Sequence, residues 1–250
     1  MRICLLFLFI LVSQLTFAQR NVKDGVIGTP MVGIHYTAIW PQADLAERYG
    51  YLNQIGLTAG YKTKRNWVYG VEGNFNFGSK INVKGMFSHL IDNQGNITEV
   101  GGVPAVVELF ARGFNINAHA GKIIPVFGSN PNSGIYLSAG VGYMLHKIRI
   151  ETTYDVVPLI ETDNKRGYDR QTTGLSLHQF IGYSHLSSKS AIHFYAGFYA
   201  NQGFTRYSRS YFYDTGLPSD PRIQNDFQIG VRGGWYIPIY KRKAKTIYFS

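Results

Sequence analysis

The chain has 250 residues, of which 45% are hydrophobic and only 16% are charged, and it contains 28 glycines, 18 tyrosines, 16 phenylalanines and a single cysteine. An ordinary soluble domain has about 25% charged residues, so this composition disfavours a soluble enzyme. The aromatic content excludes disorder, and one cysteine excludes a disulfide scaffold. The net charge of +10 would indicate nucleic-acid binding only if the basic residues gathered on one surface.

The first 18 residues have the features of a secretory signal peptide. Arg2 supplies a positive charge, Leu5–Val12 form an apolar core, and Ala18 provides a small residue at the cleavage point. We therefore expect a signal peptide at residues 1–18 and a single exported domain at residues 19–250. Cys4 leaves with the signal, so no thiol or disulfide chemistry is expected in the mature chain.

Apolar and polar residues alternate with a period of two in segment after segment, which is the pattern of a β-strand with two different faces. No later apolar run is long enough for a transmembrane helix. The alternation predicts eight strands, at residues 32–40, 51–61, 67–78, 110–120, 135–145, 175–183, 192–204 and 227–239. Two polar residues interrupt the apolar faces: we expect Arg112 to reach toward a membrane interface, and Gln179 to mark a bulge or a strand end.

The connections between these strands alternate in length. Short connections fall at residues 62–66, 128–134 and 187–190, and long ones at 41–50, 79–105, 151–171 and 207–225. This alternation is typical of an outer-membrane barrel with short periplasmic turns and long extracellular loops. The sequence thus predicts an all-β fold: a transmembrane antiparallel up-and-down β-barrel of eight strands.

A water-soluble barrel or sandwich is the alternative, since its strands alternate as well. Its polar face should carry lysine, glutamate and threonine, whereas the polar faces here carry glycine, serine, asparagine, histidine and tyrosine. Aromatic residues also gather at the strand ends, as the two girdles of a membrane barrel do. Those expected near the short turns are Tyr61, Trp67, Tyr69, Tyr183 and Trp235, and those expected near the long loops are Trp40, Tyr51, Phe77 and Phe227.

The signal junction LTFAQ, the eight alternating segments and the aromatic ending GWYIPIYKRKAKTIYFS, with Phe249 near the terminus, resemble the small outer-membrane β-barrel proteins of Bacteroidota. Within that class the chain is similar to the barrels that accompany type IX secretion and gliding machinery, the PorT and PorG kind. The resemblance implies an outer-membrane location and a role in protein secretion.

An eight-stranded barrel is filled by its own side chains, so the polar residues on the inward faces are candidate site residues. Glu72 and Arg232 are expected to pair, because an unpaired charge in a closed lumen costs several kcal/mol. With His35, His119, His178 and His193 they would form a polar plug; a gated narrow solute channel is the alternative. No histidine spacing typical of a metal site is present, and neither metal nor cofactor is expected.

Ser176 and His178 form an S-x-H pair on one predicted strand. Small barrels that deacylate or hydrolyse lipids use a serine and a histidine with a third, orienting residue. Lipid A deacylase barrels have the opposite order, with histidine before serine, and no third member is recognisable here. A membrane-embedded lipid hydrolase is therefore kept as an alternative to the leading interpretation, which is not an enzyme.

The charges are divided between the two ends of the predicted barrel. Most acidic residues, among them Asp44 and Asp226, fall in the long loops. The short turns and the C-terminal tail carry a basic rim without any acidic residue: Lys62, Lys64, Arg65, Lys189, Lys241, Arg242, Lys243 and Lys245. This rim favours contact with anionic lipid or an acidic periplasmic partner over nucleic acid.

The loops at 151–170 and 206–222 mix charges with aromatic residues such as Tyr211 and Tyr213. That mixture suits contact with a protein or glycan; loops packed on their own barrel are the alternative. The sequence thus predicts a non-enzymatic outer-membrane anchor or scaffold of an envelope assembly, in contact with membrane lipids such as lipopolysaccharide and with a periplasmic or outer-membrane protein partner.

Overall fold

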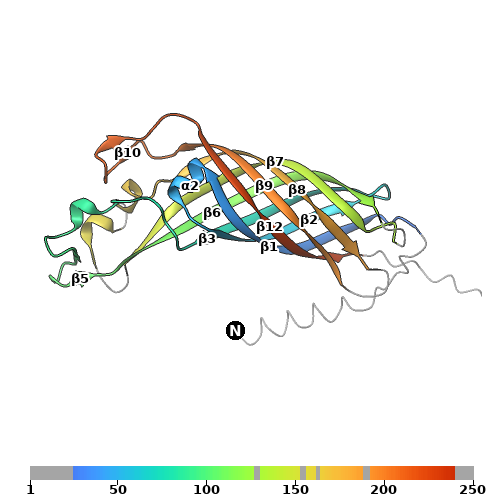
Figure 1. Cartoon of the computed structure of the whole chain (residues 1–250), viewed down its shortest axis with the longest axis horizontal. Helices are drawn as coiled ribbons and strands as arrows, with labels where there is room; N and C mark the ends of the chain where they lie inside the picture. The colour runs from blue at the N-terminus through green and yellow to red at the C-terminus, as the bar shows by residue number, and fades with distance from the viewer. Residues whose placement is uncertain (1–24, 127–129, 153–155, 162–163, 188–191, 240–250) are drawn as a thin grey trace, which may run out of the picture.

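The computed structural model describes residues 25–126, 130–152, 156–161, 164–187 and 192–239. Its main body is one barrel of eight long antiparallel strands (Figure 1). The strands are β1 (Thr29–Ala43), β2 (Leu52–Lys62), β3 (Trp67–Gly78), β6 (Val107–Pro125), β7 (Gly134–Thr152), β8 (Thr172–Leu186), β9 (His193–Tyr207) and β12 (Gln224–Pro238). The signal peptide predicted at residues 1–18 lies outside the described residues.

Each long strand pairs with its neighbours in sequence, and the first pairs with the last. The order around the ring is β1-β12-β9-β8-β7-β6-β3-β2. Pairing of β1 with β12, from Met31 opposite Pro238 to Ala43 opposite Asp226, closes the ring. The predicted eight-stranded up-and-down barrel is therefore confirmed.

Several strands are longer than the sequence predicted. Strand β7 was expected at residues 135–145 but continues to Thr152, paired with β6 throughout. Its outward residues beyond Leu145 are Lys147, Arg149 and Glu151, so the apolar alternation ends before the hydrogen-bonded strand does. The β6–β7 hairpin thus projects past the apolar part of the barrel.

The barrel has an apolar exterior and a polar interior. Along β7, Val141 and Tyr143 are 62% and 50% exposed, whereas Ser138 and His146 are buried. The predicted girdle residues Trp40, Trp67 and Trp235 are exposed as well. We call the exposed outward residues between these girdles the apolar band. An exterior of this kind suits lipid and not water.

The two polar residues on the outward faces behave differently. Arg112 donates to the carbonyl of Ala111 at 2.9 Å, and its guanidinium lies 4.9 Å from the centre of the Phe110 ring, at the long-loop end of the band. The bulge or strand end predicted at Gln179 is wrong. Gln179 lies in mid-strand with unbroken pairing to Ala139 and Ala200, where these two small neighbours leave room for its side chain to stay outside.

The short and long connections lie at opposite ends of the barrel, which we call the short-turn end and the long-loop end. In Figure 1 α2, β5 and β10 mark the long-loop end. The long loops contain α2 (Asp44–Arg48), η3 (Ser88–Leu90), β4 (Ile97–Thr98), β5 (Pro104–Ala105), η4 (Pro158–Ile160), η5 (Asn164–Gly167), β10 (Tyr211–Phe212) and β11 (Leu217–Pro218). Among the described residues no helix combines the length and apolar character needed to cross a membrane.

The long loops pack on the barrel and on one another. Leu45, Met86, Ile160 and Tyr168 come from three different loops and are all buried in one apolar cluster with Ile148 of β7. The loops therefore have a core of their own, as expected for loops packed on their barrel.

We predict that the same substitution destabilises the protein inside the apolar band and has little effect outside it. In lipid, Val141→Lys should lower the free energy of unfolding by about 2–4 kcal/mol, the cost of a lysine near the bilayer midplane. The matched control is Val100→Lys, at a loop residue that is 70% exposed, which should change stability little. Unfolding by urea in phospholipid vesicles measures both variants, and an unchanged stability of Val141→Lys would contradict a lipid-facing band.

Candidate functional site

The inward side chains at mid-height of the barrel form one hydrogen-bonded network around Arg232 of β12. Its guanidinium donates to Thr37 Oγ1 at 2.9 Å, to Glu72 Oε2 at 2.9 Å and to Gln54 Oε1 at 2.8 Å. The guanidinium carbon also lies 4.0 Å from the centre of the Tyr199 ring. Arg232 is 2% exposed, so its charge is neutralised inside the barrel and not by water.

Glu72 of β3 is the counter-charge, as the sequence predicted. Its second oxygen, Oε1, accepts from the amides of Asn74 at 2.9 Å and Asn117 at 3.0 Å. Asn74 in turn bonds His35 Nε2 at 2.6 Å. Both carboxylate oxygens are therefore satisfied, which a buried charge needs if it is not to destabilise the fold.

Three of the predicted inward histidines lie near Glu72, and the fourth lies at the short-turn end. His178 Nδ1 lies 3.8 Å from Glu72 Oε1, and the His178 ring is 5.9 Å from that of His119. His35 reaches Glu72 through Asn74. His193 belongs elsewhere: it lies at the short-turn end of β9 opposite Leu186, and its Nδ1 accepts from the backbone of Ser187 at 3.1 Å. Among the described residues, no group of His, Cys, Asp or Glu is placed to hold a metal ion.

Ser176 and His178 both face the lumen and are 1% and 2% exposed. The Ser176 hydroxyl donates to Asn117 Oδ1 at 3.4 Å, and no hydrogen bond joins it to His178 within the described chain. Ser176 therefore lacks the base contact that activates a serine nucleophile, and the pair faces away from the lipid that a hydrolase would attack.

An aromatic layer lies below the network, toward the short-turn end. Tyr195 stacks on Tyr236 with ring centres 4.5 Å apart, and its ring also meets those of Tyr136 and Phe180 edge-on. Sequence reasoning missed this layer. Alternation along residues 192–204 already places Tyr195 on the inward face. Only the structure shows that Gly234 lies opposite Tyr195, where a Cβ would come within 2.3 Å of the Tyr195 ring.

Lys62 was predicted as part of the exposed basic rim, and this prediction is wrong. Lys62 is fully buried, and its ammonium donates to the carbonyl of Ile27 at 3.0 Å and to Asn132 Oδ1 at 2.8 Å. The reason is parity: Lys62 shares the inward face of β2 with Gln54 and Thr58. Lys64 and Arg65 of the predicted rim are exposed, while Lys189, Lys241, Arg242, Lys243 and Lys245 lie outside the described residues.

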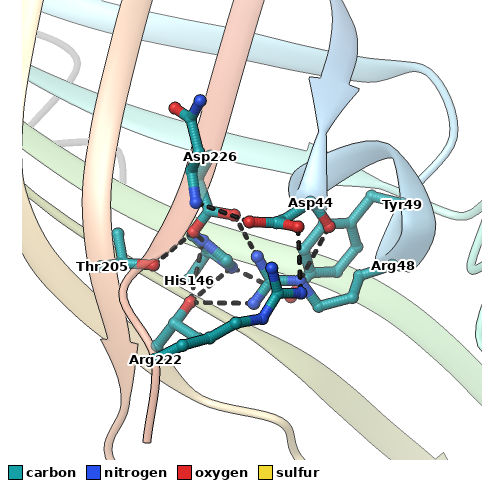
Figure 2. Close-up of polar contacts among 9 residues, drawn as sticks. Asp44, Arg48, Tyr49, His146, Thr205, Arg222 and Asp226 are labelled. Carbon is teal, nitrogen blue, oxygen red and sulfur yellow. Dashed lines mark hydrogen bonds and ion pairs between the residues drawn. The ribbon is translucent and has the colours of Figure 1, made fainter. Parts of the chain in front are cut away.

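A second charged cluster, which sequence reasoning did not find, closes the long-loop end of the lumen (Figure 2). Asp226, expected in a loop, lies buried in β12 and forms an ion pair with Arg48 of α2. Its other oxygen contacts Thr205 and, at 2.8 Å, His146 Nε2. Tyr49 Oη lies 3.2 Å from His146 Nδ1. Burial raises the pKa of Tyr49 well above its usual range, so its hydroxyl stays neutral and can donate this bond.

Helix α2 is fixed over the barrel end from outside as well. Asp44 accepts from the Arg222 guanidinium at 3.2 Å and from the backbone of Asn225 at 2.7 Å. Figure 2 shows Asp44 and Arg48 reaching from α2 toward β12. The first loop is thus held by ion pairs to the last strand and its preceding loop.

Little space remains between these layers. The cavity beside Glu72, His119 and Arg232 measures about 10 Å³, and the one beside Tyr49, His146 and Gln228 also measures about 10 Å³. Each has room for at most one water molecule. The lumen is therefore filled by side chains at mid-height and at the long-loop end.

We predict strong coupling between Glu72 and Arg232. Glu72→Gln or Arg232→Gln alone should lower the free energy of unfolding by about 3–5 kcal/mol, because each leaves the other charge buried and unpaired. The double variant should lose less than the sum of the two single losses. Glu108→Gln, at an exposed carboxylate of β6, is the control and should change stability little. Additive losses in urea unfolding would contradict the pairing.

Comparison with known proteins gives similarity of architecture only. No family model matches the chain, and no curated protein matches it. Among solved structures, Ail, the attachment invasion locus protein of Yersinia pestis, is 12% identical with a TM-score of 0.39, over 84% of this chain and 98% of that one. OprG of Pseudomonas aeruginosa is 9% identical with a TM-score of 0.40, over 86% and 99%. The N-terminal β-barrel domain of Pseudomonas aeruginosa OprF is 13% identical with a TM-score of 0.32, over 84% and 99%.

Proposed function

We propose that this protein is a non-enzymatic integral outer-membrane β-barrel that serves as an anchor or scaffold for a larger envelope assembly. The observation that carries the proposal is the filled lumen. With Arg48 and Asp226 paired at the long-loop end and Arg232 and Glu72 paired at mid-height, the interior supports the barrel, and the two lumen cavities beside these pairs in the described part of the chain measure only about 10 Å³ each. Function then belongs to the outside surfaces.

The apolar band supports the membrane location. Outward residues such as Val141, Leu175 and Phe198 are 62–70% exposed, and water would disfavour so large a contiguous apolar surface. A closed barrel is one of the two structures that satisfy all backbone hydrogen bonds in lipid. The signal sequence predicted at residues 1–18 would direct export of such a barrel from the cytoplasm.

The ends of the barrel offer surfaces for partners. At the long-loop end, Val100, Val103, Val156 and Leu159 are 56–70% exposed although they lie beyond the apolar band. They come from two loops joined by a bond from the Val100 amide to the Val156 carbonyl at 3.0 Å. Exposed apolar residues clustered outside the membrane suit contact with another protein.

At the short-turn end, Lys64 and Arg65 are exposed at the β2–β3 turn. These charges suit an acidic periplasmic protein, and the predicted tail cluster Lys241–Lys245 would extend the same basic rim. The sequence resemblance to barrels of the type IX secretion and gliding machinery adds a secretion-related assembly to the proposal.

Affinity capture in mild detergent tests the proposal. We expect envelope proteins to co-purify with the native barrel, and the charge reversal Lys64→Glu/Arg65→Glu to reduce recovery of a periplasmic partner severalfold. The matched control reverses two bases at the other end, Lys165→Glu/Arg166→Glu, and should leave that partner's recovery unchanged. A native barrel that purifies alone would contradict the scaffold role, and equal recovery with both double variants would contradict docking at the short-turn end.

A further inference from the structure

A groove of about 760 Å³ runs along the outside of the barrel where the β6–β7 hairpin leaves the apolar band. Six basic side chains and only two acidic ones line it. The basic residues are Arg112, Lys147, Arg149, Lys165, Arg166 and Arg209, and the acidic ones are Glu151 and Asp169. The acidic side chains are engaged within the groove: Glu151 pairs with Arg149 at 2.5 Å and Asp169 with Arg209 at 2.6 Å.

Two of the remaining bases stand side by side without a counter-charge. Arg112 of β6 lies directly opposite Lys147 of β7, and both side chains point outward. Within the described chain neither forms an ion pair. Like charges opposite each other on neighbouring strands destabilise a sheet, so this pair is costly unless an anion lies between the two.

The position of the pair relative to the apolar band indicates what kind of anion fits. One step toward the middle of the barrel, β6, β7 and the neighbouring strand β3 carry Phe114, Leu145 and Phe75 in a row. Phe75 also lines the groove itself. The groove therefore joins apolar surface to basic surface, and its ligand should have an anionic head and an apolar body.

We infer that this groove binds a phosphate-bearing lipid headgroup of the outer leaflet, with the phosphate between Arg112 and Lys147 and an acyl chain along Phe75 and Phe114. A guanidinium and an ammonium are the usual protein partners of phosphate. A soluble phosphate would use the two bases but gain nothing from the apolar row, which favours a lipid as the source. The inference rests on the proposed outer-membrane location and names the lipid that the barrel holds.

The test uses the full-length purified barrel in phosphatidylcholine nanodiscs containing a trace of diphosphoryl lipid A, with bound lipid counted by native mass spectrometry. Arg112→Gln/Lys147→Gln should weaken lipid A retention about tenfold or more, since it removes both charged hydrogen-bond donors to the phosphate. Lys64→Gln/Arg65→Gln, which removes the same charge at the opposite end, should retain lipid A as the native protein does. Equal retention by the two double variants would overturn the site.

Two further arms identify the source of the phosphate and check folding. Lipid A stripped of its phosphates should bind as weakly to the native barrel as diphosphoryl lipid A does to Arg112→Gln/Lys147→Gln. Displacement of lipid A by an equal concentration of inorganic pyrophosphate would assign the groove to a soluble anion instead and overturn the inference.

Without lipid A, Arg112→Gln/Lys147→Gln should unfold at the same urea concentration as the native protein or at a higher one, because a pair of like charges has been removed. A lower midpoint of unfolding would contradict the unfavourable contact between the two bases. These measurements need no protein partner, so they can fail independently of the affinity capture.

Discussion

The pairing of β1 with β12 is the constraint on which the rest of the structure depends. It leaves no free edge among the eight long strands, so backbone hydrogen bonds are satisfied within the ring and the exterior can be wholly apolar. An apolar exterior in turn determines the composition of the interior. Side chains alternate along each strand, so an apolar outside forces a polar inside, and in a narrow barrel those polar groups must satisfy one another.

The interior meets this demand in layers. Arg232 and Glu72 neutralise each other at mid-height with amide and hydroxyl groups on their remaining donors and acceptors. Arg48 and Asp226 do the same at the long-loop end. At the short-turn end the buried Lys62 ammonium donates instead to two neutral oxygens, the Ile27 carbonyl and Asn132 Oδ1. Because every one of these charges is buried, their pairing fixes which strands and loops can lie together. Because the interior is filled, the surfaces available for binding are the loops, the short turns and the outer face of the β6–β7 hairpin.

The fold could be predicted from sequence because one property, the period-two alternation, encodes it directly. The same property predicts that Glu72 and Arg232 face inward, and electrostatics predicts their pairing. Alternation says nothing about height along the barrel, so the separate position of His193 and the contact between Arg48 and Asp226 could not be foreseen. Residue Lys62 is different, since its parity with Gln54 already placed it inside; a short turn was wrongly taken as evidence of exposure.

The ends of the strands were also predicted incorrectly, for a physical reason. Outward residues need to be apolar only where they meet lipid, so Lys147 and Arg149 ended the predicted strand although β7 continues to Thr152. That projecting segment carries the opposed pair of Arg112 and Lys147. The outward basic residues that made the predicted strand too short are thus the residues that line the groove.

Single-channel recording in a planar lipid bilayer tests whether the lumen is closed by its own side chains. We predict no large and stable conductance for the purified native barrel at either polarity. A large, stable conductance that changes when Arg232 is replaced by glutamine would show that ions pass through the centre of the barrel, and would contradict the closed lumen.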